Sequence, residues 1–378
     1  MLILLFTLLI GLGCSSDDEH LSQETVEAAI SSRCMLRRLY DKYKSDHGLI
    51  RSQHEHPHRL TLFEKTLKRI QQLKKNSEIT WRVGFTPLSD LTDAEIQTQY
   101  MGANVTMLEA SIDLQMGEVE TPPVLQAGTI PEEYDWRNPY NIPQITFVTR
   151  VQHQKEGSCW ARAAVVPLEA LMRKHSGKLI PLSVFEIYDS TYQGENGYDD
   201  RGSGGHFVDA WKWLQRNGKL SSRQDIPDRP GAKPTHFMKY AYDDEENVFR
   251  GFKIEKIYKA KDVNKLVSSV FLNSPVAIIM WVEGLDLKHY KGDPMYSSAC
   301  KKGRNHAMAV VGYTKRTLVI KNSWGVEWGD EGYLIWKRMV NMRTQCGLYD
   351  NAYYPTISYD RSIIEEKYED EDADDNGW

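Results

Sequence analysis

Four side chains are of the types needed for nucleophilic catalysis: a nucleophile, the groups that activate it and a donor to an oxyanion. The candidate nucleophile is Cys159. It lies in the segment QKEGSCW, and a helix-like run, SCWARAAVV, follows it. A cysteine attacks as its thiolate, which a helix N-terminus and a nearby imidazolium both favour. Because Gly157 permits a tight turn and Ser158 can cap a helix, we expect Cys159 at a helix N-terminus. The alternative is a cysteine buried as a small apolar residue.

The other three side chains come from distant parts of the chain. His306 precedes an apolar, strand-like run in RNHAMAVVGY, and Asn322 follows another in IKNSWG. An asparagine can hold the second ring nitrogen of a histidine, which gives a Cys-His-Asn triad. Gln154 can donate its side-chain amide to a developing oxyanion, beside the backbone N–H of Cys159. Taken singly, each of these residues is more often structural.

The segments that must position these side chains differ along the chain. In 59–75 apolar residues recur at threes and fours, and 31–46 is also helix-like, so both segments are predicted helices. Residues 118–131 contain three prolines without periodicity, which indicates a linker. The acidic end, 359–378, is predicted to be disordered. Three apolar runs are typical of strands: 275–282, 306–313 and 317–324.

Length and composition limit the possible functions. The chain has 378 residues, enough for one large domain or two ordinary ones, and its net charge of −5 argues against nucleic acid as a partner. The apolar run 1–13 is too short to span a bilayer comfortably, so residues 1–16 are predicted to be a secretory signal peptide, with a short membrane anchor as the alternative. We expect no contact with a membrane after signal removal.

With their flanks, the four side chains resemble the signature segments of the papain-like cysteine peptidases, the family of the cathepsins. The segments QKEGSCWA, NHAMAVVGY and KNSWGVEWGDEGY carry the resemblance, and IPEEYDWR at 130–137 is similar to the family's mature N-terminus. The match continues in order through 357, with LSVFEIYD, GSGG and CGLYDNAYYP. The resemblance implies an α+β fold of two subdomains, a helical one and a β-barrel-like one, with the cleft between them.

The preceding segment resembles the inhibitory propeptide of the cathepsin L-like branch. Its helix motif, E-x3-R-x3-F-x2-N-x3-I-x3-N, is matched except at the two asparagines, and the motif G-x-N-x-F-x-D is matched at Gly84 and Asp90. The matching helix residues are Glu55, Arg59, Phe63 and Ile70. The resemblance therefore implies a zymogen that is processed at about 117–130. Its predicted parts are a signal peptide at 1–16, a propeptide at 17–125, a peptidase domain at 126–358 and a tail at 359–378.

The resemblance also implies a role for each site residue. Cys159 is expected to form a thioacyl-enzyme, His306 to transfer protons, Asn322 to orient His306, and Gln154 to stabilise the oxyanion. Trp324 is expected to shield the Asn322–His306 pair from water. The backbones of two glycines, Gly204 and Gly205, are expected to bind substrate. Four residues fall near the family's specificity pocket: His206, Ile279, Ala307 and Asn351.

The expected partners follow from the same resemblance. They are protein or peptide substrates and the chain's own propeptide, which acts as an intramolecular inhibitor. No metal and no organic cofactor is implied. The enzyme is expected to be a monomer in the secretory pathway, either lysosomal or extracellular.

The cysteines depart from the family pattern. Only four residues separate Gln154 from Cys159, one fewer than usual, and the cysteine of that loop is missing. Ser190 stands where its disulfide partner would lie, and a second family pair is also absent. The resemblance leaves one bridge, between Cys300 and Cys346.

Two substitutions fall in the helix that Cys159 is expected to begin. Arg162 occupies a position that is usually aromatic and buried, and Pro167 removes a helical hydrogen bond, which usually bends the helix. These departures keep open a catalytically weak or inactive homologue with a binding or structural role. A free inhibitor made of the propeptide alone is a third possibility. The joint presence of the four polar side chains favours the enzyme.

Overall fold

The computed structural model describes residues 23–103, 130–142, 145–191, 204–228, 248–283, 285–297, 300–338 and 345–363. The predicted signal peptide, nearly all of the predicted linker and residues 364–378 lie outside these ranges. The chain divides into two compact units, Met1–Lys75 and Asn76–Trp378, and each is described by itself.

The first unit is helical, and its helices pack through apolar faces. On the longest helix, buried residues recur at threes and fours, as its sequence predicts, and Phe63 packs against Tyr40 and Tyr43 with ring centroids 5.1 and 4.9 Å apart. Arg59 donates to Glu55 at 3.1 Å, so two residues of the propeptide-like motif pair with each other. Both predicted helices are confirmed. The helices are α1 (Gln23–Ser31), α2 (Arg33–Asp46) and α3 (His56–Lys75).

The second unit begins with two short elements. Strand β1 (Arg82–Val83) pairs with β5 (Tyr290–Gly292), and helix α4 (Asp93–Tyr100) follows. A capping box fixes the start of α4, because the Thr92 hydroxyl accepts from the Glu95 N–H while the Glu95 carboxylate accepts from the Thr92 N–H. The chain leaves α4 at Tyr100 and passes directly into the candidate site.

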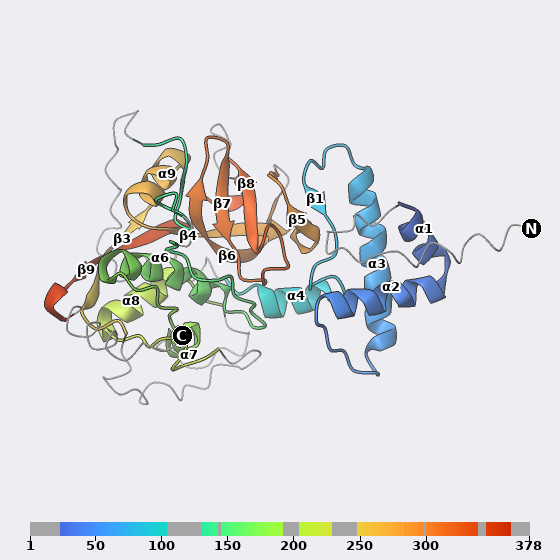
Figure 1. The fold of residues 1–378 in the computed structure, drawn as a ribbon, viewed down its shortest axis with the longest axis horizontal. Coiled ribbons are helices and arrows are strands. Elements are labelled where there is room, and N and C mark those ends of the chain that lie inside the picture. The colour runs from blue at the N-terminus through green and yellow to red at the C-terminus, as the bar shows by residue number, and fades with distance from the viewer. Residues whose placement is uncertain are drawn as a thin grey trace, which may run out of the picture. The chain divides into compact units, whose positions relative to one another are not determined.

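Three helices form one side of the second unit (Figure 1): α6 (Cys159–Ser176), α7 (Val184–Thr191) and α8 (Phe207–Asn217). Most of α6 is buried, and the Trp211 indole of α8 donates to the Ala164 carbonyl at 2.9 Å. The helix continues through Pro167 as one element. These helices share an apolar cluster with one face of the sheet.

The sheet is antiparallel, with strand order β3-β9-β4-β6-β7-β8 and β2 added to β6. Side chains of β4 alternate between two clusters: Ala277 and Ile279 face the helical cluster, while Ile278 and Met280 face the other. The strands are β2 (Tyr134–Asp135), β3 (Phe252–Lys259), β4 (Val276–Glu283), β6 (Lys301–Tyr313), β7 (Thr317–Lys321), β8 (Tyr333–Lys337) and β9 (Ala352–Tyr359).

The expected barrel-like closure is not found in the described sheet. Its path runs from β3 at one edge to β8 at the other, and the described residues of these two strands do not pair. Helix α9 (Val263–Leu272) packs against β4 and β6. The described part of the unit also has two short 3-10 helices, Leu287–His289 and Gln345–Gly347.

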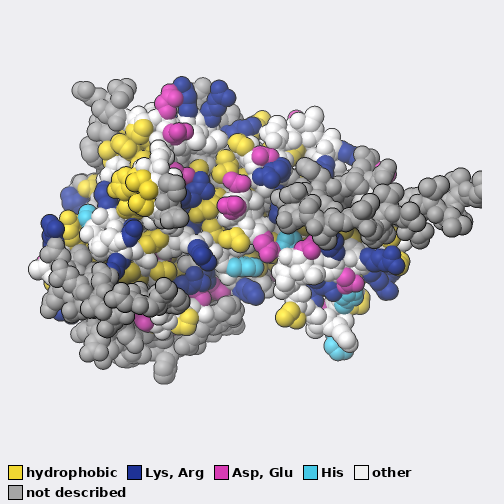
Figure 2. All heavy atoms as spheres, in the orientation of Figure 1, with side chains coloured by type: hydrophobic (Ala, Val, Ile, Leu, Met, Phe, Trp, Pro, Cys, Tyr) yellow, Lys and Arg dark blue, Asp and Glu magenta, His cyan; other side chains and the backbone are white. Residues whose placement is uncertain are grey.

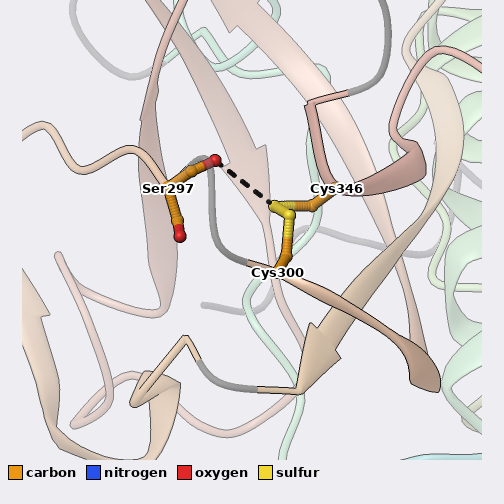
Figure 3. The surroundings of a disulfide bond; sticks show 3 residues. All are labelled: Ser297, Cys300 and Cys346. Atoms are coloured by element: carbon orange, nitrogen blue, oxygen red, sulfur yellow. Dashed lines mark hydrogen bonds between the residues drawn. A yellow bond between two sulfur atoms is a disulfide. The ribbon is translucent and has the colours of Figure 1, made fainter.

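One disulfide joins Cys300 to Cys346 across 46 residues, as the resemblance implied (Figure 3). Closing a loop of this length stabilises the fold by about 4 kcal/mol on the chain-entropy model. Among the described cysteines, Cys34 is free and exposed, and Cys159 is free and buried.

The surface charge and the character of the helices bear on possible partners. On the face drawn in Figure 2, basic and acidic side chains are interspersed, in keeping with the near balance of 47 and 52 residues. No described helix combines the length and the apolar character needed to cross a bilayer.

Candidate active site

The N-terminus of α6 carries Cys159, as predicted, but Ser158 does not cap it. The Ser158 hydroxyl donates to Glu156 Oε1 at 2.6 Å and accepts from Arg162 Nε at 3.0 Å, and it makes no capping hydrogen bond. The predicted cap is wrong because the Ser158 hydroxyl forms its hydrogen bonds with Glu156 and Arg162 instead of with the helix backbone. The start of the helix is set by the backbone, where the Arg162 N–H donates to the Ser158 carbonyl at 3.0 Å.

His306 lies within strand β6 rather than before it, opposite Met280 of β4. Asn322 comes directly after β7, the next strand in the sheet, and Lys321 at the end of β7 pairs with Ala309. This register brings the two polar side chains together, with His306 Nε2 and Asn322 Oδ1 2.7 Å apart. Both residues are buried.

The sulfur of Cys159 lies close to the backbone N–H of Ala307, the residue after His306. Backbone N–H groups close to the sulfur favour its thiolate, and the largest such contribution comes from Ala307, the residue after His306. The Cys159 side chain is fully buried, however, and this burial outweighs those donors and raises the pKa of the thiol.

The imidazole of His306 is also held neutral. Burial lowers the pKa of His306 to about 4, although its hydrogen bond to Asn322 and the nearby backbone of Tyr100 oppose this shift. The ring lies 4.7 Å from that of Trp324, measured between centroids, which helps to exclude water. A neutral thiol is a poor nucleophile, and in the described form both Cys159 and His306 are held uncharged by burial.

The amide of Gln154 is fixed at both ends. Its Oε1 accepts from Ser323 Oγ at 2.5 Å, while its Nε2 donates to the carbonyls of Glu156 at 2.8 Å and Gln99 at 3.1 Å. Gln99 belongs to α4, in the propeptide-like segment. A backbone carbonyl therefore occupies the place where we expected Gln154 to receive an oxyanion.

Residues 99–103 pass through the whole site. The Trp324 indole donates to the Tyr100 carbonyl at 3.3 Å, and the Tyr100 hydroxyl contacts His153 Nε2 at 3.3 Å. Further along, the Gly205 N–H donates to the Gly102 carbonyl at 2.9 Å, and residues 103 and 205 form a parallel bridge. The backbones of Gly102 and Ala103 also lie close to the Cys159 sulfur, so this segment covers the cysteine.

Gly102 permits this close approach. A Cβ built at this position would overlap the backbone carbonyl of Gly157, in the loop before Cys159. We therefore expect Gly102→Ala to weaken self-inhibition roughly tenfold or more, since overpacking typically costs about 1–3 kcal/mol. The measurement is the peptidase activity of the intact zymogen before processing, compared with that of Thr98→Ala, an exposed change in α4. Equal latency in both variants would mean that this segment does not block the site.

The structure brings three of the predicted pocket residues together. Ile279 pairs with Ala307 across β4 and β6, and its N–H donates to the Asn351 carbonyl at 3.0 Å. The fourth, His206, is buried and caps α8, since its Nδ1 accepts from the Val208 N–H at 3.1 Å. Burial lowers the pKa of His206 to about 3, so its ring is neutral.

The two predicted substrate-binding glycines differ in their surroundings. Gly204 is half-buried, whereas a Cβ at Gly205 would overlap the Trp160 ring, so the backbone at 205 lies directly on the start of α6. No group of three or more His, Cys, Asp or Glu residues in the described ranges could hold a metal ion.

Sequence reasoning missed several residues that shape the site. Neither Tyr100 nor His153 belongs to a recognisable motif. The only signal for Tyr100 in the sequence is that it is an aromatic residue at the end of a helix with a capping pattern. The buried contacts of Arg162 join residues up to 66 positions apart, which no local pattern reveals.

Comparison with family models decides the identity of the fold and site. The model described as papain family cysteine protease matches residues 130–356, and the cathepsin propeptide inhibitor domain matches residues 40–96. The chain belongs to the papain family of cysteine proteases. It is a cysteine endopeptidase zymogen, with an inhibitory propeptide ahead of the peptidase domain.

Individual relatives support this assignment. Papain from Carica papaya is 29% identical over 336 residues, covering 86% of this chain and 88% of papain, and vignain from Vigna mungo is 25% identical, covering 93% and 92%. The proform of the ragweed pollen allergen Amb a 11 superposes with a TM-score of 0.70 at 24% identity, covering 87% of this chain and 97% of that one. The stem bromelain precursor gives 0.68 at 22%, covering 85% and 98%. These structures share the fold of this papain-family zymogen.

Proposed function

We propose that the processed enzyme hydrolyses peptide bonds through Cys159, His306 and Asn322. The thiolate attacks the scissile carbonyl, and the His306 imidazolium protonates the leaving amine. Water that has given a proton to His306 then releases the acyl group from the sulfur. The observation that carries this proposal is the 2.7 Å contact between His306 Nε2 and Asn322 Oδ1, together with the Ala307 N–H, one residue along from His306, close to the Cys159 sulfur.

Asn322 has the surroundings of an orienting residue. Its Oδ1 accepts from the Ser323 N–H at 2.8 Å as well as from His306, so the amide cannot rotate freely. An acceptor at Nε2 keeps a proton on that nitrogen and leaves Nδ1 for the thiol. Trp324 covers the pair and raises the strength of its hydrogen bond by excluding water.

The oxyanion is bound by Gln154 Nε2 and the Cys159 backbone N–H. In the zymogen the Gln99 carbonyl accepts from the same amide, which supports this role because a substrate carbonyl can take its place. The backbones of Gly204 and Gly205 bind the substrate chain. The specificity pocket is formed by His206, Ile279, Ala307 and Asn351.

The propeptide keeps the enzyme latent until processing at about 117–130. Its contacts with Gln154 and Gly205 occupy the same groups that substrate would use, and a further contact reaches Trp324. The parts of the chain are a signal peptide at 1–16, a propeptide at 17–125, a peptidase domain at 126–358 and a tail at 359–378. Strand β9 extends to Tyr359, one residue into the proposed tail.

We place the enzyme in the secretory pathway, in lysosomes or outside the cell, as a monomer that cleaves proteins or peptides. The apolar run at 1–13 and the disulfide support this placement. One similar protein from Arabidopsis thaliana, 25% identical, is named a KDEL-tailed cysteine endopeptidase.

A fluorogenic peptide assay on acid-treated protein tests the proposal. Hydrolysis should appear as the propeptide is removed and should stop after alkylation with iodoacetamide. Fully processed protein that hydrolyses no peptide would instead support an inactive homologue with a binding role. The shortened loop before Cys159 and the substitutions at Arg162 and Pro167 favour that second candidate.

Gln154→Ala provides a narrower prediction. Removing one oxyanion donor should lower kcat by about 10²–10³, with little change in KM, because the interaction forms only in the transition state. Steady-state kinetics on processed enzyme would measure both constants, with Lys155→Ala as the adjacent control. A kcat equal to that of the parent would remove Gln154 from the oxyanion site.

A further inference from the structure

The loop 152–158 is spanned by a buried arginine. Arg162 lies one turn into α6, and only 4% of its side chain is exposed. The loop carries Gln154 and leads directly into Cys159, so its shape sets the distance between the two proposed oxyanion donors. The Arg162 guanidinium hydrogen-bonds four side chains: Ser158 Oγ (3.0 Å), Glu156 Oε1 (2.6 Å), Asp228 Oδ2 (3.0 Å) and Gln152 Oε1.

These contacts join the start, the middle and the end of the loop. Gln152 also accepts, through its backbone carbonyl, from the Gly325 N–H at 2.9 Å, which ties the start of the loop to the segment after Asn322. The loop contains no cysteine, so no disulfide can hold it. The planar fork of one arginine supplies the cross-links instead.

The cluster is balanced in charge. Glu156 and Asp228 face Arg162, and Arg223 pairs with Asp228 from the outer side at 2.7 Å. Burial of Glu156 favours its neutral form, but the Arg162 charge and the hydrogen bonds to it prevail and lower the pKa of the carboxyl. The carboxylate therefore stays charged, and a buried guanidinium with two charged partners has a fixed position.

We propose that Arg162 is a positioning residue for catalysis, which holds the loop so that the Gln154 amide and the Cys159 N–H converge on the oxyanion. This inference rests on the proposed function, since it concerns the same site. Arg162 acts indirectly, because its guanidinium binds the loop and Asp228 and positions the residues that contact substrate. Preorganised donors lose much of their effect when their supporting contacts are removed.

The test separates positioning from folding by two readouts on processed enzyme. Hydrolysis of a peptide amide passes through an oxyanion, whereas alkylation of Cys159 by iodoacetamide does not. Arg162→Gln should lower kcat by about 10- to 100-fold, the loss expected for a misplaced oxyanion donor. KM and the alkylation rate should stay within about twofold of the parent. Arg162→Lys should restore only part of the activity, because an ammonium cannot bind four groups in one plane.

Two further variants sharpen the result. Arg223→Gln removes the outer arm of the same cluster without touching the loop, and it should leave kcat within about twofold. In a Gln154→Ala background, Arg162→Gln should have little further effect, because both changes disable one oxyanion site. Additive losses would overturn the proposal.

The remaining outcomes distinguish failure of the positioning role from failure of the proposed function. A kcat unchanged in Arg162→Gln, in a parent that hydrolyses peptide, overturns the positioning role and leaves the proposed function intact. Equal falls in kcat and alkylation rate show a merely structural role. If Arg162→Gln does not fold, Glu156→Gln replaces it, because this change keeps the side-chain shape and removes one charge. The same comparison of kcat with the alkylation rate then decides the result. A parent without activity contradicts the proposed function first.

Discussion

Cys159→Ala should remove essentially all peptidase activity. Loss of a nucleophile costs roughly 10⁶ in turnover in a comparable triad. No other described thiol can replace it, because Cys300 and Cys346 are bonded to each other and Cys34 lies in the first unit. Activity of the purified, processed variant on a fluorogenic peptide measures the effect.

The control on the zymogen is Cys34→Ala, which removes the exposed free cysteine of the proposed propeptide and should leave the processed enzyme as active as the parent. Thermal unfolding of the two zymogen variants should be similar to that of the parent, since alanine fits the space that the Cys159 side chain fills. If the Cys159 variant turned over peptide at the parental rate, the enzymatic assignment would fail.

His306→Ala should reduce turnover by roughly 10⁴-fold or more, because the proton donor and acceptor of both steps is removed. It should also slow the alkylation of Cys159 at pH 6, since a neighbouring imidazolium favours the thiolate. His175→Ala, at a half-buried histidine in the last turn of α6 that stacks on Tyr359, is the control and should change neither rate. Alkylation as fast as in the parent would separate His306 from the nucleophile.

The buried pair also explains latency. In the zymogen, burial raises the pKa of the Cys159 thiol and lowers the pKa of His306 to about 4. Between pH 5 and 7 both groups are therefore neutral, and the thiolate–imidazolium form is not available. We expect that removal of residues 99–103 returns water to the site and weakens the burial that causes both shifts, so that processing opens the site and also restores its charges.

Much of the fold followed from local pattern. Helices α2 and α3 were predicted from apolar spacing, and β4 and β7 from apolar runs, because the burial of one face imposes a period on the sequence. The run at 306–313 was predicted as a strand, but the strand starts earlier than the run. Strand β6 begins at Lys301, five residues before the apolar run, and pairing with β4 rather than hydrophobicity makes this part a strand.

The polar details depended on contacts between distant residues. Ser158 has the residue type of a cap, but its hydroxyl is occupied by Glu156 and Arg162. Asp228 lies 66 residues after Arg162 and completes its cluster. The open sheet likewise reflects the strand order rather than any single strand. Such features arise from tertiary packing, which a periodic pattern does not encode.

The most direct test of the central claim is the site of the covalent intermediate. Processed enzyme would be quenched in acid during turnover of a peptide ester, digested, and mapped by mass spectrometry. The account predicts that the acyl group is on the peptide containing Cys159, and that Cys159→Ala carries none. Acylation of another residue, or hydrolysis without any acyl-enzyme on Cys159 under single-turnover conditions, would contradict it.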